Sequence, residues 1–271
     1  MQHKRGIAAS TRLQLMLDNF WLDAAGVIGL LHVVGPMAMR NTYRFAARCT
    51  PLQVAPAELP TPVAVRILPH MKQMETLGFA LVGCYDLGEL AIHTKSYVAY
   101  FCNPATNDFA NVTAVVSPRG VGSYFEFSTR FSNGTVLETN TNGVPPLTPG
   151  NPDVRVFRFA EITEPQELFV LHHQLLEKYA GELWPVGETK GLEIQRLVRV
   201  LENYGPRHAK IGYMVLADGG GFYRLTWKGA FLMAWRGLLP ASLIRQALER
   251  QAMRAERRAL DGGGVAALQK A

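Results

Sequence analysis

The sequence is poor in charged residues and in cysteine. Only 18% of its 271 residues are charged and 48% are hydrophobic, which excludes an intrinsically disordered chain. No fixed-period repeat is present, so solenoids and coiled coils are excluded as well. The three cysteines are odd in number and widely spaced, unlike those of a disulfide scaffold, and they favour a reduced compartment.

The excess of positive charge is concentrated at the two ends of the chain. Residues 1–48 hold six basic and two acidic residues, and residues 224–258 hold eight and two. The stretch between them, 49–223, has thirteen basic and seventeen acidic residues. Two basic regions therefore flank a mildly acidic middle, and we expect the ends to meet an anionic surface.

Residues 20–39 form the most apolar stretch of the sequence. Twenty residues give about 30 Å of helix, enough to cross a hydrocarbon core, and Trp21 lies at one end, where aromatic residues favour the lipid interface. We therefore expect a transmembrane anchor. Asp23 and His32 leave open a buried or interfacial helix, and a cleaved signal peptide is the third alternative. Basic residues flank both ends equally, so orientation is open.

The residues from 49 to 153 predict a linker, a helix and an antiparallel sheet. Residues 49–60 read as a proline-punctuated linker, and Pro62 stands in the first turn of a helix that ends at Gly78. Five strands follow, over 79–86, 95–102, 109–117, 125–131 and 135–139, with Asn133-Gly134 as a hairpin turn between the last two. Their short connections predict a five-stranded antiparallel meander.

The region 154–271 predicts a helical module with a hairpin. Helices are expected near 164–179 and 190–203, strand–turn–strand over 212–225, and a helix from Lys228. Tyr204-Gly205-Pro206 is expected to interrupt the helical region, and Ile244 begins the apolar face of an amphipathic helix that continues to residue 259. The fold class is therefore α+β, divided into 1–48, 49–153 and 154–271.

Two resemblances accompany these residues. The stretch Phe222-Tyr223-Arg224-Leu225-Thr226-Trp227-Lys228-Gly229 resembles the wing of winged-helix domains, which implies a hairpin leading into a closing helix. The chain as a whole is similar to uncharacterised bacterial proteins with an N-terminal membrane anchor and an Arg-Leu-Thr-Trp-Lys-Gly-Ala ending. That likeness implies an architecture and no chemistry.

No set of residues predicts a catalytic, cofactor or metal site. His173 and Glu177 stand four apart on a helix, but two ligands do not complete a metal site, and His172 falls on the apolar stripe. Gly219-Gly220-Gly221 lacks the Lys-Ser/Thr of a phosphate-binding loop and reads as a turn. We therefore expect a non-enzymatic protein without cofactors.

The leading hypothesis is a membrane-associated binding, scaffold or accessory subunit, anchored through residues 20–39 with its body in the cytoplasm. A soluble cytoplasmic protein is the alternative localisation. The basic C-terminal helices are expected to contact an anionic membrane face or a protein partner. The residues expected to make this contact are Trp21, Trp227, Lys228, Phe231, Trp235, Arg236, Arg245, Arg250 and Arg254. A nucleic-acid-binding regulator that uses the winged-helix-like hairpin is the competing hypothesis.

Overall fold

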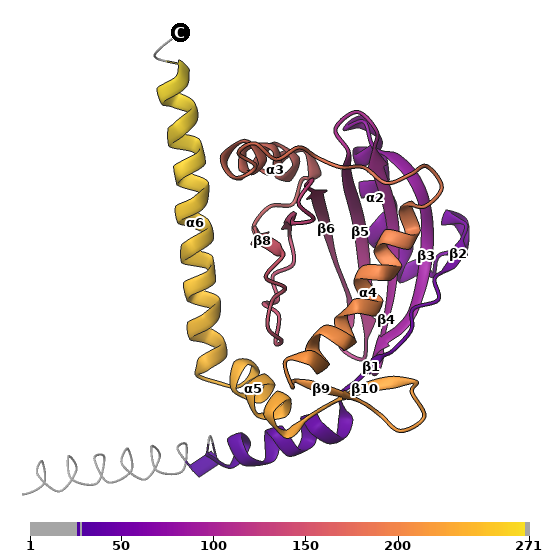
Figure 1. The fold of residues 1–271 in the computed structure, drawn as a ribbon, viewed down its shortest axis with the longest axis vertical. Coiled ribbons are helices and arrows are strands. Elements are labelled where there is room, and N and C mark those ends of the chain that lie inside the picture. Colours follow the sequence, from indigo (N-terminus) through magenta and orange to yellow (C-terminus); the bar gives the residue numbers. More distant parts are fainter. Residues whose placement is uncertain (1–25, 28, 269–271) are drawn as a thin grey trace, which may run out of the picture.

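The computed structural model describes residues 26–27 and 29–268, with side chains through Leu260. A large sheet lies at the centre of the protein, with helices on both of its faces (Figure 1). Its strands are β1 (Arg44–Ala46), β2 (Leu52–Val54), β3 (Ala80–Ala91), β4 (Thr94–Asn103), β5 (Asp108–Ser117), β6 (Gly120–Arg130), β7 (Val136–Asn140), β8 (Val154–Arg158), β9 (Met214–Leu216) and β10 (Phe222–Leu225). The helices are a first one over residues 29–42, η1 (Pro56–Glu58), α2 (Thr61–Thr76), α3 (Pro165–Tyr179), α4 (Glu193–Lys210), α5 (Trp227–Gly237) and α6 (Ala241–Leu268).

The sheet has ten strands in the order β8-β7-β6-β5-β4-β3-β1-β10-β9, and β2 pairs with β3 beside this path. All pairs are antiparallel except β7 with β8. The register places Ala110 of β5 opposite Phe127 of β6, and Thr129 opposite Asp108. Because side chains alternate between the faces of a strand, this register decides which residues reach each layer of helices.

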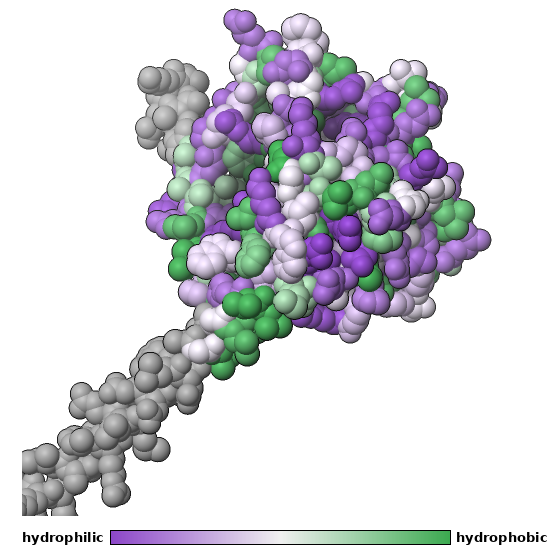
Figure 2. Space-filling model, turned by 60° about the horizontal axis from the view of Figure 1, so that its bottom comes forward, coloured by the Kyte–Doolittle hydropathy of each residue, from purple (hydrophilic) through white to green (hydrophobic). Residues whose placement is uncertain are grey.

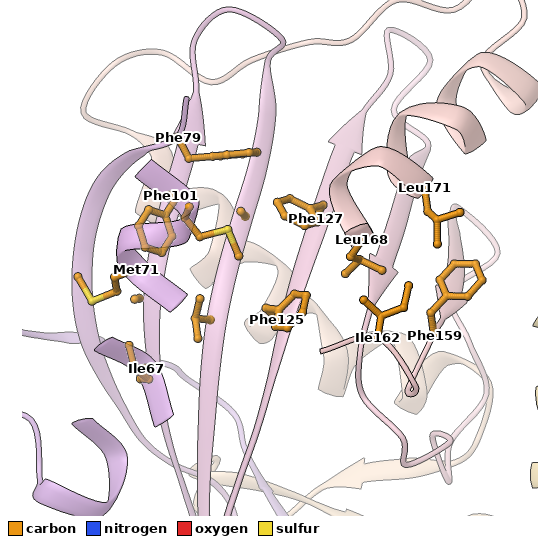
Figure 3. Packing of buried hydrophobic residues seen from close by; sticks show 14 of the residues in the cluster. Ile67, Met71, Phe79, Phe101, Phe125, Phe127, Phe159, Ile162, Leu168 and Leu171 are labelled. Carbon is orange, nitrogen blue, oxygen red and sulfur yellow. The ribbon is translucent and has the colours of Figure 1, made fainter. Parts of the chain in front are cut away.

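One face of the sheet carries the main hydrophobic core. Phe125 and Phe127 of β6 point toward α2 and α3, where they meet Ile67, Leu168 and their neighbours (Figure 3). The apolar residues of α2 at 63, 67, 71 and 74 are all buried, as the helical spacing requires. Burial of these side chains is the dominant stabilising contribution to the fold.

The opposite face is covered by α4. Ile194, Leu197 and Leu201 of this helix pack on a second, smaller cluster that includes Tyr100 and Phe109. The guanidinium of Arg196 lies 4.0 Å from the centre of the Phe109 ring, so this face combines apolar and cationic contacts.

The expected five-stranded meander is wrong as a description of the sheet. The five strands β3 to β7 follow one another as predicted in their order, but β8 joins beside β7, and β1 joins the hairpin β9–β10 to the other side through pairs such as Phe45 with Tyr223. Three of the added strands have only three residues, too few to show an alternating pattern. The hairpin that resembles a wing thus belongs to the main sheet.

The expected transmembrane helix is also wrong for the part of the chain that the structure describes. There, no helix combines the length and hydrophobicity that a membrane crossing needs. The helix over 29–42 extends past Arg40, and Pro36 on one of its sides is buried. Most of the apolar side chains of this helix, at positions 30, 31, 33, 34 and 37, are exposed. Trp21 and the rest of the stretch before residue 26 lie outside the described residues.

The expected interruption at Tyr204-Gly205-Pro206 does not occur, because α4 continues through these residues to Lys210. A side chain on Gly205 would meet the Tyr223 ring at 2.2 Å, so the glycine lets β10 approach the helix closely. Packing of Tyr204 against Phe45, with ring centres 4.3 Å apart, helps to hold the helix across the proline. Tertiary contacts here override local propensity.

Candidate functional site: an apolar surface without acidic residues

The helix over 29–42 lies along α5 at one end of the molecule (Figure 1). A Cβ on Gly35 would stand 3.2 Å from Leu238 and 3.8 Å from Ala234, so the two helices approach closely at this glycine. The Arg40 guanidinium lies 4.6 Å from the centre of the Trp227 ring, and the ring centres of His32 and Trp235 are 5.3 Å apart. The helix over 29–42 and α5 therefore pack against each other as one unit.

The start of α5 is held firmly against the hairpin that precedes it. The Thr226 hydroxyl caps the helix by accepting from the Gly229 amide at 3.0 Å, and it donates to the Gly212 carbonyl at 2.7 Å. A Cβ on Gly229 would fall 2.0 Å from the Tyr213 carbonyl oxygen, so only glycine fits there. This cap and close contact determine which side of α5 faces outward.

The outward side of this unit is apolar. Trp227, Phe231 and Trp235, spaced four residues apart on α5, are 48%, 51% and 61% exposed. Apolar residues gather around the described part of the first helix (Figure 2). We call the following exposed side chains the acid-free surface: Leu30, Leu31, Val33, Val34, Met37, Trp227, Phe231, Leu232, Trp235 and Leu239. Contiguous exposed apolar patches are characteristic of interaction sites.

The two chain segments that carry the acid-free surface contain basic residues and no acidic ones. Residues 26–48 contain three basic residues and no acidic one, and residues 219–248 contain four basic residues and no acidic one. Arg40 lies over Trp227, and Arg44 lies 5.0 Å from the centre of the Phe222 ring. Lys228 donates to the Ile211 carbonyl at 2.9 Å. The surface is thus apolar in its middle and cationic at its edge.

The structure separates the residues expected to contact a membrane or partner into two groups. Trp227, Lys228, Phe231, Trp235 and Arg236 lie together on α5. The basic residues of α6 lie elsewhere.

Arg245 donates to the carbonyls of Pro146 and Pro145 at 2.6 and 3.5 Å, so its charge holds a loop against α6. Arg250 and Arg254 line a cavity between α6 and the body. The apolar run of the sequence includes the exposed aliphatic residues of the first helix, and Ile244 on the expected apolar face of α6 is 57% exposed.

The two adjacent histidines of α3 have different surroundings. His172 is fully buried, with Nε2 2.8 Å from the Thr129 hydroxyl and Nδ1 3.0 Å from that of Thr139. Burial lowers the pKa of His172 to about 4, so the ring is neutral at pH 7. Both nitrogens are occupied, and the residue has a structural role.

His173 is half-buried, and its Nε2 lies 3.2 Å from Oδ2 of the buried Asp108. Burial opposes ionisation of Asp108, but the contact with His173, the nearby His172 and two nearby threonine hydroxyls together lower its pKa. Among the described residues, no three His, Cys, Asp or Glu side chains converge in a way that suits a metal ion. The cluster stabilises the junction of α3 with the sheet.

The three cysteines are free thiols. Burial raises the pKa of Cys49, Cys84 and Cys102, which keeps them protonated and weakly nucleophilic at neutral pH.

No protein-family model, curated protein or solved structure matches this chain, so the geometry of its own residues carries the functional inference.

Proposed function

We propose that the protein is a non-enzymatic binding or accessory protein that docks on an anionic lipid surface, with its acid-free surface lying in the plane of the interface. The observation that carries this proposal is the combination of exposed Trp and Phe side chains on α5 with the basic residues, and the absence of acidic ones, in the segments 26–48 and 219–248. No helix needs to cross the membrane for this mode of association.

The aromatic side chains suit the lipid headgroup region. Trp227 and Trp235 have large apolar rings with one polar N–H, the combination that favours the boundary between water and hydrocarbon. With Phe231 between them they form a row along α5, beside the aliphatic residues of the first helix. Each apolar side chain that leaves water on docking contributes favourably in proportion to its buried area.

The cationic edge suits an anionic partner. A basic residue close to an anionic membrane contributes about 1 kcal/mol, and Arg40, Lys228 and Arg236 lie next to the aromatic row. A second copy of this chain fits less well, because a symmetric dimer would bring two surfaces of the same charge together. Charge complementarity therefore favours anionic lipid as the occupant.

Flotation of the purified full chain with vesicles tests the proposal. Vesicles of phosphatidylcholine with phosphatidylglycerol should carry the protein upward, and pure phosphatidylcholine should carry much less. Trp235→Ala should lower the partition coefficient about fivefold or more. The matched control is Trp184→Ala, since Trp184 is 65% exposed but lies outside the acid-free surface, and it should change the coefficient less than about twofold.

Other occupants give distinct outcomes. Wild-type protein that stays at the bottom of the gradient with anionic vesicles contradicts the proposal. A concentration-dependent dimer that Trp235→Ala abolishes would assign the surface to a second copy instead. Binding to duplex DNA that Trp235→Ala and Lys228→Gln both weaken, without vesicle binding, would support the nucleic-acid hypothesis.

A further inference from the structure

A cavity of about 310 Å³ lies between α6, the end of β8 and the loop over residues 142–145. Its polar lining includes Asn142, Arg158, Gln246, Glu249, Arg250 and Arg254. Met253 and Pro145 contribute apolar wall. A volume near 300 Å³ is at the lower end of the range for small-molecule sites.

The acidic residues of this cavity already have basic partners. Glu249 Oε1 accepts from Arg158 at 3.0 Å, and Glu161 lies 3.9 Å from Arg257. Arg250 and Arg254 have no acidic side chain within 4.0 Å among the described residues. The cavity is therefore lined by two exposed arginines whose charge no carboxylate of the described residues neutralises.

The spacing of these arginines favours an anion between them. Arg250 and Arg254 are four residues apart on α6, which places two like charges on one helix face at a net cost in stability. An anion that contacts both guanidinium groups would convert this repulsion into two charge-assisted hydrogen bonds. The oxygen atoms of a phosphate group match the fork of an arginine.

Two amide side chains add neutral hydrogen-bonding groups to the same cavity. Asn142 uses its Oδ1 to accept from the Val144 amide at 3.0 Å, which leaves its Nδ2 as a donor. Gln246 stands one helical turn before Arg250. From this geometry we propose that the cavity binds a phosphate group of a small molecule or lipid headgroup, held by Arg250 and Arg254 with Asn142 and Gln246 as further donors.

Equilibrium dialysis of the full chain with radiolabelled pyrophosphate tests the proposal directly. At 0.15 M salt we expect saturable binding of one pyrophosphate per chain. Arg250→Gln and Arg254→Gln should each weaken it about tenfold, because each removes a charge-assisted hydrogen bond. The control is Arg258→Gln, which removes an exposed arginine of the same helix outside the cavity and should change the dissociation constant less than about twofold.

Two results would overturn the proposal. One is absence of saturable binding up to millimolar pyrophosphate. The other is an equal loss of pyrophosphate affinity in all three variants, which would show a general response to net charge.

A second arm distinguishes the source of the phosphate. If pyrophosphate displaces the wild type, but not Arg250→Gln, from phosphatidic acid vesicles at constant ionic strength, the cavity is assigned to a lipid headgroup. Pyrophosphate that binds without affecting vesicle flotation assigns it to a soluble ligand. The cavity proposal does not rest on lipid docking, and pyrophosphate binding by a protein that ignores vesicles would refute only the docking.

Discussion

Phe127 and Phe231 are the same residue type in opposite surroundings. Phe127 is 0% exposed, with the rings of Phe79 and Phe169 centred 5.5 and 5.1 Å away. Phe231 is 51% exposed on α5, between two exposed tryptophans. The core buries its aromatic residues by alternation along a strand, whereas the acid-free surface presents them along a helix. Apolar side chains stabilise the fold in the first region and are available to a partner in the second.

Replacing each phenylalanine by alanine tests this contrast most strongly. Phe127→Ala should lower the free energy of unfolding by about 3–5 kcal/mol, because it leaves a cavity between the sheet and α3. Phe231→Ala should change it by less than about 1 kcal/mol but reduce vesicle binding. Urea unfolding followed by tryptophan fluorescence measures the free energy of unfolding of both variants. Equal destabilisation by the two substitutions would show that the acid-free surface is packed in the free protein.

Gly229→Ala tests how the acid-free surface is attached to the body. The new methyl group would overlap the Tyr213 carbonyl, so we expect a loss of about 3 kcal/mol in unfolding free energy, the upper end for overpacking. Gly237→Ala is the control on the same helix, since its Cβ would meet Leu147 at an ordinary 3.5 Å, and it should change stability by less than about 1 kcal/mol. Unchanged stability of Gly229→Ala would mean that α5 shifts freely.

The buried His172 should make the core, and not the acid-free surface, sensitive to mild acid. Burial lowers its pKa from the ordinary histidine value of 6.5 to about 4 in the folded protein, so below pH 6.5 the unfolded chain takes up a proton that the folded chain does not. The free energy of unfolding should be highest above pH 6.5, and it should fall by about 2 kcal/mol between pH 7 and pH 5.

Urea unfolding of His172→Gln at the same two pH values provides the comparison. The variant should be less stable at pH 7, because the threonine contacts are altered, but its loss between pH 7 and pH 5 should be smaller by about that amount. A wild-type stability that is flat over this range would contradict the neutral, buried state of His172.

Local patterns predicted the elements of this fold well where the pattern is long. The alternation around Phe125 and Phe127, the turn at Asn133-Gly134 and the proline at the start of α2 all correspond to elements near the expected residues. Three-residue strands such as β1 carry no such pattern, and their pairing joins segments far apart in the chain. Sequence patterns alone therefore could not predict the full extent of the sheet.

The candidate site shows the same division. The sequence by itself determined that residues 26–48 and 219–248 are apolar, aromatic and free of acidic residues, since this is a property of composition. Only the tertiary structure decided that the first helix packs along α5, and that Arg245 holds a loop while Arg250 and Arg254 face a cavity. The physical reason is that a helix presents several faces, and which face meets solvent depends on contacts with residues about a hundred positions away, such as Arg158 with Glu249.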